Sequence, residues 1–516
     1  MKLKVKYLGI EAGGKPIVIL NKADAEELGI KSLGRVKIRY KNKRATGIVN
    51  IGISVVESGE IGIYEEVREK LRVSNGEFVE VKVAEYPKSI KFIREKLRGR
   101  RLKENEFYQI VKDVVEGNLT DIEITAFVTA LHAHGISIEE AVGLTNSMVK
   151  TGETFRLKRR CILDKHSIGG ACGDKTSLIL VPIIAATGFT IPKTSSRAIT
   201  SAAGTADRAE VLMPVSLEIE EMKMVVEKTN GCLVWGGALH LAPADDIFIK
   251  IEYPLGIDPL LFPSIMSKKK AIGSTHLVID IPTGRGTKVK TIGDANYLGK
   301  DFIELGKRLG IKVAIAITNG EKPIGRCVGP ALEAREALEI LMRKKWKNVE
   351  DQIDKVIDIA AILLKMVGVK NSREVALRAL KSGKAEKKMR EIIEMQGGDP
   401  RVRPKDIVIG ENTLDYVANS NGSVIWMDTH SIVEIARLAG APKDKGAGVY
   451  IWKKVGEKVK KGEKIFTIYA EKERKLENVE RYLEEKKVVG IGKKSEMLIQ
   501  AMREELVHEK TFILER

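Results

Sequence analysis

Alternating apolar and polar positions dominate the start of the chain. The runs VKIRY, GIVNI and FVEVKVAEY alternate in this way, are rich in β-branched residues and are separated by glycine turns, which is typical of half-buried strands. Among them, NKADAEELGI predicts a short helix. We therefore predict a β-rich N-terminal domain over residues 1–86, and this stretch contains no cluster of residues suited to catalysis.

The apolar period becomes helical in the next part of the chain. In FYQIVKDVV the apolar residues recur at three- and four-residue spacing, which places them on one helical face. Thr120 and Glu123 have the spacing of a capping box, and short turns such as HGIS join the predicted helices. These features predict a helical domain over residues 87–155, to which the helix-like stretch 238–272 returns.

Strand-like and helix-like runs then alternate. HLVIDIP, YLGKDFIELGKRLG, KVAIAIT and PALEAREALEILMRK follow one another in β-α-β-α order, which is typical of a parallel sheet with helices on its faces. We assign residues 156–237 and 273–425 to this α/β domain. Ligands of such sheets bind outside the carboxyl ends of the strands, and polar loops follow predicted strands at 164–177, 194–205 and 282–290.

The composition shifts again near the end of the chain. GAGVYIWKKVGEKVKKGEKIFTIYA contains short strand-like runs separated by glycine turns, so we predict a small α+β C-terminal domain over residues 426–516. This domain carries no acid–base cluster, and we expect it to support assembly rather than chemistry. The predicted fold class is therefore α/β, with a helical domain, a parallel-type α/β sheet domain, a β-rich N-terminal domain and a small C-terminal domain.

Composition and charge narrow the function classes. The chain has 516 residues, too many for one ordinary domain, and lacks a run of about eighteen apolar residues or the apolar block of a signal peptide. We expect a cytoplasmic protein that has no membrane partner.

The formal net charge is +18, which we interpret as a solvated surface of mixed charge, as in heat-adapted proteins, with basic pockets for anionic substrates. The four cysteines lack CxxC spacing, which argues against a zinc site and a disulfide framework.

One segment carries a recognisable binding chemistry. DKHSIGGACGDKTS, residues 164–177, lies between the apolar runs RCIL and LILVPIIAA. This pattern predicts a strand, a glycine loop and a helix that begins near Lys175. Backbone N–H groups, the positive end of a helix and the side chains of Lys165 and Lys175 make the loop suited to binding phosphate. It is not a Walker loop, because the GxxxxGK[ST] spacing is absent.

This segment, the later TSSRAITSAAGTADRAE, and SIMSKK together resemble the thymidine and pyrimidine-nucleoside phosphorylase family over roughly residues 88–510. The run KKVGEKVKKGEKIFTIYA is similar to the C-terminal domain of that family. Two departures favour the branch that acts on nucleoside 5′-monophosphates. SSRAITSAAGT stands where the bacterial nucleoside enzymes have a glycine-rich SGRGLGHTGGT, and the β-rich N-terminal domain is absent from the nucleoside enzymes.

The resemblance implies a nucleoside phosphorylase-like fold and a phosphorolysis reaction. A nucleoside monophosphate (AMP, with CMP and UMP also open) would yield free base and ribose 1,5-bisphosphate in nucleotide catabolism or salvage. The reaction needs one site for the attacking phosphate, one for the 5′-phosphate and a group that protonates the leaving base. Inorganic phosphate is a co-substrate, and we expect no cofactor and no metal. The expected partners are these small molecules and further copies of the chain, as a dimer or larger, without nucleic acid.

Site residues follow from the same resemblance, position by position. The family's contacts to the attacking phosphate match Lys165, Ser167, Ser177, Ser195 and Thr205. Its nucleotide contacts match Gly170, Ser196, Arg197, Ala198, Ile199, Thr200, Ser201, Thr205, Ser264, Lys268 and Lys288.

Several of these residues have chemistry that suits a particular part of the substrate. Arg197 can bind the 5′-phosphate with two N–H groups, while Ser264 and Lys268, four residues apart on one helical face, suit the base. Asp258 matches the family's proton donor; its alternative role is to cap the segment that follows it. His166 is a further candidate for contact with the base or sugar.

Three other functions remain open at the level of the sequence. A pyrimidine-nucleoside phosphorylase on the same fold would leave Arg197, Thr200 and Lys288 without an anion to bind. A phosphoribosyltransferase of the anthranilate type would need an acidic magnesium site, and the sequence offers no convincing one. An RNA-binding protein would use the +18 charge, but nothing in the chain matches an RRM or KH motif.

Overall fold

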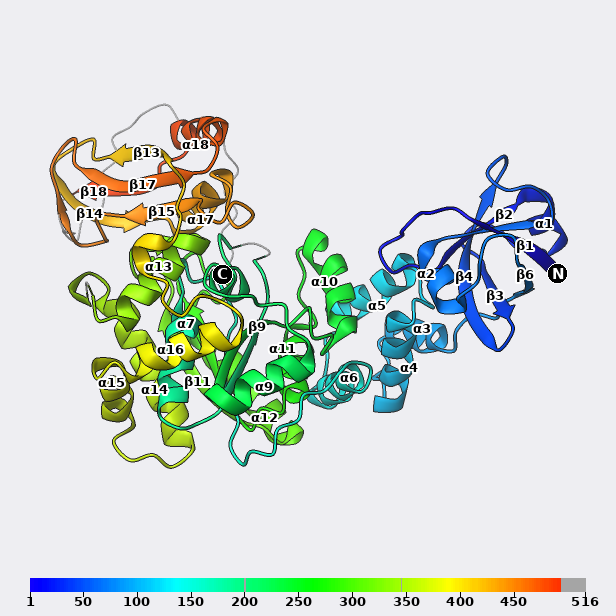
Figure 1. Cartoon of the computed structure of the whole chain (residues 1–516), viewed down its shortest axis with the longest axis horizontal. Coiled ribbons are helices and arrows are strands. Elements are labelled where there is room, and N and C mark those ends of the chain that lie inside the picture. Colours follow the sequence, from blue (N-terminus) through cyan, green and yellow to red (C-terminus); the bar gives the residue numbers. More distant parts are fainter. Residues whose placement is uncertain (199–200, 345, 493–516) are drawn as a thin grey trace.

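The computed structural model describes residues 1–198, 201–344 and 346–492. The chain runs from a barrel at one end of the molecule through a helical bundle to an α/β domain, against which the C-terminal domain packs (Figure 1). In the described ranges, no helix is both long enough and apolar enough to cross a membrane.

The N-terminal segment forms a closed six-stranded barrel in the order β1-β5-β2-β4-β3-β6. Its strands are β1 (Lys2–Tyr7), β2 (Ile17–Asn21), β3 (Arg35–Tyr40), β4 (Lys43–Gly52), β5 (Glu60–Ile63) and β6 (Phe78–Val83), and its helices are α1 (Lys22–Glu27) and α2 (Glu65–Leu71). Alternate residues such as Val36 and Ile38 are buried in the barrel core, while closure of the sheet removes its free edges. The strands predicted over VKIRY, GIVNI and FVEVKVAEY are confirmed.

A helical bundle follows the barrel. Its helices are α3 (Ser89–Leu97), α4 (Glu104–Val115), α5 (Asp121–His134), α6 (Ile138–Lys150), α10 (Pro243–Leu255) and α11 (Leu261–Ala271). The predicted capping box at Thr120 and Glu123 is present at the start of α5. Phe127 packs at the centre of the bundle against Phe107 and Phe248, with ring centroids 6.2 and 6.0 Å apart. Because α10 and α11 come much later in the chain, three connections join the bundle and the α/β domain: one after α6, one before α10 and one after α11.

The α/β domain is built on a parallel sheet. Its strands are β7 (Leu163–Ser167), β8 (Ile191–Ser195), β9 (Gly231–Trp235), β10 (His276–Thr283) and β11 (Lys312–Asn319). Strands β11, β10 and β7 are adjacent, β8 pairs with β9, and a bridge between Ile162 and Thr190 joins the two groups. All of these pairings are parallel, so the loops that follow β7, β8 and β10 leave the sheet at the same edge.

Helices cover both faces of this sheet. They are α7 (Thr176–Ala186), α8 (Thr205–Ala209), α9 (Ile219–Thr229), α12 (Ile292–Leu309), α13 (Pro330–Leu341), α14 (Glu350–Met366), α15 (Ser372–Lys381) and α16 (Lys384–Met395), with 3-10 turns η1 (Trp346–Asn348) and η2 (Pro404–Asp406). One apolar core joins α7, α13, α14 and α16, whereas α11 and α12 pack on the other face around Ile279 and Phe302. The predicted β-α-β-α order of β10, α12, β11 and α13 is confirmed.

The C-terminal domain is attached to the α/β domain through a shared sheet. It contains β13 (Asn412–Val417), β14 (Gly422–Met427), β15 (Gly448–Ile451), β16 (Lys458–Val459), β17 (Lys464–Ala470), β18 (Val489–Gly492), α17 (Thr429–Leu438) and α18 (Arg474–Glu485). A short strand of the α/β domain, β12 (Cys327–Val328), pairs with β15 in the sheet β12-β15-β17-β13. The apolar core of the C-terminal domain also includes Cys172 and Ala202, which belong to two of the polar loops at the edge of the parallel sheet.

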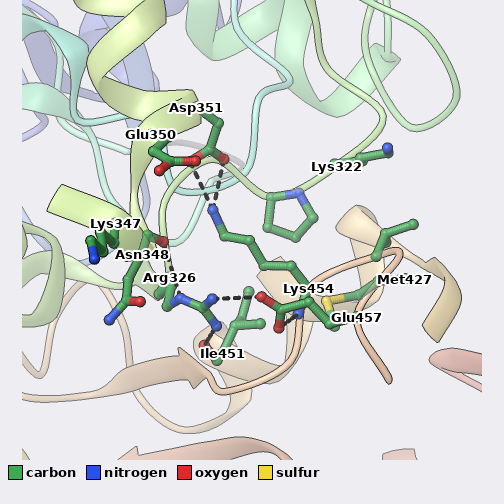
Figure 2. A pocket seen from close by; sticks show the side chains of 12 residues that line it. Lys322, Arg326, Lys347, Asn348, Glu350, Asp351, Met427, Ile451, Lys454 and Glu457 are labelled. Carbon is green, nitrogen blue, oxygen red and sulfur yellow. Dashed lines mark hydrogen bonds and ion pairs between the residues drawn. The ribbon is translucent and has the colours of Figure 1, made fainter. Parts of the chain in front are cut away.

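Ion pairs cross the seam between these domains, and two of them border one cavity. Arg326 Nη2 lies 2.8 Å from Glu457 Oε1, and Lys454 Nζ lies 2.8 Å from Asp351 Oδ1 (Figure 2). A cavity of about 280 Å³ lies between them and is lined by residues of both domains. None of the predicted site residues lines this cavity, so it belongs to the domain seam rather than to the edge of the parallel sheet.

Candidate active site

The loops after β7 and β10 touch each other at Gly170. Gly170 has φ +92°, and a Cβ built on it would lie 3.0 Å from the backbone nitrogen of Lys288 and 3.0 Å from Cα of Thr287. Only a residue without a side chain allows the two loops to approach so closely in this conformation. Two of the predicted nucleotide-binding positions, Gly170 and Lys288, are therefore brought together although they are far apart in the sequence.

Lys165 belongs to a buried group of two lysines and two aspartates. Its Nζ lies 3.1 Å from Asp280 on β10 and 3.7 Å from Asp174, and Lys355 on α14 lies 3.0 and 3.2 Å from the same two carboxylates. Burial opposes ionisation of Asp174, but the cations Lys355 and Lys165 outweigh it and hold the pKa of Asp174 well below its usual range. The charge of Lys165 is thus balanced inside the protein, and the group ties the loop that follows β7, the predicted phosphate loop, to β10 and α14.

In the loop that follows β7, the hydroxyls of Ser167 and Ser177 have surroundings that differ from those of the Lys175 amine. Ser167 Oγ is buried and has no hydrogen-bond partner among the described residues, and Ser177 is buried in the first turn of α7. A helix beginning near Lys175 is confirmed, since Lys175 is the residue before α7. The expectation that Lys175 adds its charge to the loop is wrong: its side chain is fully buried and pairs with Glu336 on α13.

The loop after β8 is held by hydrogen bonds to its neighbours. Ser195 Oγ donates to the carbonyl of Val234 on β9 at 3.3 Å, and Ser201 Oγ donates to Ala203 at 3.1 Å. Ser196 is exposed, and Thr205 is half-buried as the first residue of α8. Ile199 and Thr200, both predicted nucleotide contacts, lie outside the described residues.

Arg197 is occupied by protein carboxylates. Its Nη1 and Nη2 lie 2.7 and 2.5 Å from the two carboxylate oxygens of Glu210, and Nη1 is 3.4 Å from Asp207. The guanidinium also lies over the ring of Trp235, 4.9 Å from its centroid. Hydrogen bonds from Arg197, helped by Lys445, lower the pKa of Glu210 to about 2 against the effect of burial. Asp207 additionally accepts the N–H of Ala198 at 2.7 Å.

Ser264 and Lys268 meet at one buried carboxylate. Asp245 on α10 accepts a hydrogen bond from Ser264 Oγ at 2.9 Å, and its Oδ2 lies 2.5 Å from Lys268 Nζ. Burial opposes the charge of Lys268, but Asp245 raises the pKa of Lys268 above its usual range. The two predicted base contacts therefore share a face of α11, as expected, and Asp245 orients them. The sequence offered a signal for Asp245 in the acidic pair of PADDIF.

His166 faces a cluster of buried lysines. Lys269 Nζ lies 2.8 Å from Asp164, and Lys193 on β8 is buried and donates to the carbonyl of Thr194 at 2.5 Å. Burial, together with Lys269 and Lys193, holds the pKa of His166 well below its usual range. His166 is therefore neutral near pH 7, and its imidazole can donate or accept one hydrogen bond without carrying charge. Sequence reasoning missed Lys193, which lies in the middle of the largely buried strand β8.

Asp258 faces the loop after β10 from the connection between α10 and α11. Its Oδ2 lies 3.4 Å from Lys288 Nζ, and both side chains are about half exposed, at 46% and 56%. Glu252, one turn before the end of α10, is buried and accepts the N–H of Leu260 at 3.2 Å. Burial and the nearby charge of Asp258 raise the pKa of Glu252 to about 7. Asp258 is thus an accessible carboxylate beside Lys288, and a second carboxyl, that of Glu252, lies close to it.

The donor set suits anions and a nucleobase. Cations, hydroxyls and backbone N–H groups lie on three loops that leave the sheet at the same edge, and an exposed carboxylate and a neutral imidazole are the further hydrogen-bonding groups. In residues 1–198, 201–344 and 346–492, no group of three or more His, Cys, Asp or Glu side chains has the arrangement of a metal site.

Comparison with known families matches three ranges of the chain. The domain described as "Glycosyl transferase family, helical bundle domain" matches residues 90–152, and "Glycosyl transferase family, a/b domain" matches residues 159–386. The "Pyrimidine nucleoside phosphorylase C-terminal domain" matches residues 424–489. These ranges correspond to the helical bundle, the α/β domain and the C-terminal domain.

Several curated relatives are similar to almost the whole chain. The AMP phosphorylase of Thermofilum pendens is 50% identical over 516 residues, which cover 100% of both chains. The AMP phosphorylase of Pyrococcus furiosus is 50% identical over 499 residues, 95% of this chain and 98% of the relative. The AMP phosphorylase of Thermococcus kodakarensis is 50% identical over 482 residues, which cover 92% of this chain and 95% of the relative.

Among solved structures, the anthranilate phosphoribosyltransferase of Thermus thermophilus is similar with a TM-score of 0.50. The identity is 18%, and the match covers 59% of this chain and 98% of that one. This similarity concerns the fold alone.

Proposed function

The chain belongs to the AMP phosphorylase family, and on that premise we propose how its residues carry out the phosphorolysis of AMP. In this reaction an oxygen of inorganic phosphate bonds to C1′ of the ribose while the bond from C1′ to the base nitrogen breaks. The products are adenine and ribose 1,5-bisphosphate. The enzyme is therefore a pentosyltransferase, in agreement with its glycosyl transferase domains.

Inorganic phosphate binds in the loop that follows β7. The buried hydroxyl of Ser167, unpaired among the described residues, supports this position, as does the N-terminal turn of α7 at Ser177, whose dipole attracts an anion. Lys165 brings a positive charge that Asp174 and Asp280 hold in place. Ser195 and Thr205 lie at the two ends of the neighbouring loop and complete the contacts. The dianion is positioned as the nucleophile without forming a bond to the protein.

The 5′-phosphate binds on the other side of the ribose. The segment from Ser196 to Ser201 and Lys288 supply this second anion site, and Gly170 allows backbone to approach the nucleotide closely. Arg197 joins the phosphate by exchanging its contact with Glu210. The observation that carries the proposal is that the loops after β7, β8 and β10 leave the sheet at one edge, because two anions must be held within the length of one ribose.

The base lies against α11. Ser264 and Lys268, oriented by Asp245, contact the ring, and His166 offers a neutral hydrogen-bonding group beside it. Asp258 donates the proton that the base nitrogen needs as its bond to C1′ breaks. A free nucleoside would leave the second anion site empty, which favours nucleotides over the pyrimidine nucleosides as substrates. CMP and UMP remain candidates beside AMP.

Release of free base from AMP tests the function directly. Purified protein should release adenine from AMP only when inorganic phosphate is added, and ribose 1,5-bisphosphate should appear in equal amount. Uridine and thymidine, supplied under the same conditions, should react much more slowly than AMP. Base release without added phosphate, or faster release from uridine or thymidine, would contradict the proposal.

The active species is proposed to be a homo-oligomer, a dimer or larger, that needs phosphate as co-substrate and no cofactor. The mass of the protein in solution, measured by light scattering, tests the assembly. Full activity after exhaustive treatment with a chelator is the result expected for a reaction that uses no divalent metal.

A further inference from the structure

Four charged side chains from two domains meet beside the loop between β8 and α8, here called the nucleotide loop. Arg197 comes from the loop, Asp207 and Glu210 from α8 and the residue after it, and Lys445 from the C-terminal domain. Lys445 Nζ lies 2.7 Å from the same Glu210 oxygen that Arg197 Nη1 contacts at 2.7 Å. Both cations also lie 3.4 Å from Asp207 Oδ1. Two positive charges thus balance two negative charges, and each cation shares both carboxylates.

Arg197 presents the Nη1–Nη2 end of its guanidinium to Glu210. A phosphate can occupy this same end, with its two parallel N–H groups, only if the guanidinium leaves that carboxylate. Without another cation, the departure would leave Asp207 and Glu210 uncompensated, with Asp207 only 4% exposed. A buried carboxylate without a counter-charge is costly, and its field would repel the incoming phosphate.

We propose that Lys445 is a positioning residue for the 5′-phosphate: it balances Glu210 and Asp207, so that Arg197 is free to turn to the nucleotide. This inference rests on the proposed function, in which Arg197 contacts the 5′-phosphate. It gives the C-terminal domain a part in substrate selection, because a nucleoside without a 5′-phosphate does not draw Arg197 away from Glu210.

The backbone around the other three members of the group is anchored. The carbonyl of Lys445 accepts the N–H of Ala331 at 3.0 Å, at the start of α13, and the N–H of Gly446 donates to Glu471 at 2.7 Å. Helix α8 is tied to α13 by Arg208 and Glu333, 2.6 Å apart. The shared sheet and the ion pairs of the seam hold the two domains together (Figure 2). The backbones that carry the two carboxylates and Lys445 are therefore fixed. Arg197 can move from Glu210 to the phosphate by a change in its side-chain conformation alone.

The test replaces Lys445 by methionine, which keeps the length of the side chain and removes its charge. Steady-state kinetics with AMP and with adenosine are measured for the full-length protein, together with the affinity for each by calorimetry. Lys445→Met should raise KM for AMP roughly fivefold, the size of one partly exposed charge interaction, and change kcat less. The constants for adenosine should stay within about twofold of wild type, because adenosine leaves the Arg197–Glu210 pair in place.

Two further variants separate charge from shape. Lys445→Arg keeps the charge and should restore the KM for AMP. Adding Glu210→Gln to Lys445→Met removes the excess negative charge and should also bring KM back toward wild type, whereas a purely structural defect would grow. Lys454→Met is the matched control, because Lys454 pairs with Asp351 across the same domain seam, away from the nucleotide loop; its KM for AMP should not change.

The outcomes distinguish this inference from the proposed function. If Lys445→Met alters AMP and adenosine by the same factor, or no more than Lys454→Met does, Lys445 has no positioning role. If Arg197→Ala discriminates between AMP and adenosine while Lys445→Met does not, the inference fails and the proposed function stands. If Arg197→Ala lowers kcat/KM for both substrates equally, the assignment of Arg197 to the 5′-phosphate is wrong, and the role of Lys445 falls with it.

Discussion

Asp258 Oδ2 lies 3.4 Å from Lys288 Nζ, and this contact joins the helical bundle to the loop after β10. Both side chains are about half exposed, so the pair is weak by itself and open to substrate. The proposed proton donor and a proposed contact of the nucleotide therefore lie next to each other at the surface. A nucleotide that enters between them would have its base next to Asp258 and its sugar-phosphate next to Lys288.

Replacing Asp258 by asparagine should slow the chemical step. The amide keeps the size and a hydrogen-bond donor but has no proton to transfer, and general acid catalysis contributes roughly a hundred- to ten-thousand-fold. We expect kcat for AMP to fall within that range, with KM changed little because the phosphate contacts remain. Measurement of kcat and KM for Asp258→Asn, with the exposed Asp301→Asn on α12 as a control, tests this.

A substrate with a better leaving group provides a second check on Asp258. A nucleotide whose base departs without protonation should lose less rate in Asp258→Asn than AMP does. Near-normal kcat on AMP, or the same loss on both substrates, would show that Asp258 has a structural role, and His166 would become the next candidate.

The secondary structure could be predicted because its signals are local. KVAIAIT became β11 and the PALEAREALEILMRK run became α13, since apolar periodicity reports on a strand or helix within a few residues. The start of α7 after Lys175 followed from the change between a glycine loop and an apolar run. Asp280 in HLVIDIP was also a visible signal, because a charged residue in a buried strand needs a partner, here Lys165 and Lys355.

The direction of side chains could not be predicted in the same way. Lys175 lies in the phosphate loop by sequence, yet its amine is drawn into the protein by Glu336, which belongs to a helix far along the chain. Arg197 is likewise held by Glu210, which Lys445 of the C-terminal domain also contacts. The lack of an acid–base cluster in that domain predicts a role in assembly, and this stays a prediction; the contacts of Lys445 with Asp207 and Glu210 are recorded by no local pattern.

Gly170 should be essential for the close approach of two substrate loops. Gly170→Ala would place a Cβ 3.0 Å from the backbone of Lys288, in addition to the strain of a positive φ of +92°. Gly169 has nearly the same φ, +93°, but a Cβ there meets nothing within 4 Å. The two alanine variants therefore share the backbone strain and differ in the contact.

We expect Gly170→Ala to raise KM for AMP about tenfold more than Gly169→Ala, equivalent to roughly 1.4 kcal/mol. Kinetics of both variants at saturating phosphate measure the difference. Equal effects of the two substitutions would mean that the contact between Gly170 and Lys288 does not shape the nucleotide site.

Asp245 should govern recognition of the base. Asp245→Asn removes the charge that balances Lys268 and weakens the hydrogen bond from Ser264. Loss of one member of a buried pair costs about 3–5 kcal/mol in fully buried cases, and somewhat less here because Lys268 is 29% exposed. We expect weaker binding of AMP and of free adenine with an unchanged KM for phosphate. The exposed Asp301→Asn on α12 is the control, and a rise in the KM for phosphate with Asp245→Asn would contradict the assignment.

Glu252 should make the stability of the helical bundle depend on pH. Burial and Asp258 raise the pKa of Glu252 from 4.5 to about 7 in the folded protein, so the folded state holds a proton that the unfolded state has released between these values. The contribution of Glu252 to the free energy of unfolding is then fully present below about pH 4.5. It is lost as pH rises through 7, by up to about 3 kcal/mol. Glu252→Gln, which cannot ionise, should lose this dependence and become more stable than wild type above about pH 7.

Denaturant midpoints measured from about pH 4.5 to about pH 8 test the prediction, with the exposed Glu227→Gln as the control. Since the charge of Asp258 contributes to the shift, Asp258→Asn should move the decline to lower pH; a wild-type midpoint that runs parallel to that of Glu252→Gln across the whole range would show that Glu252 is already ionised in the folded protein.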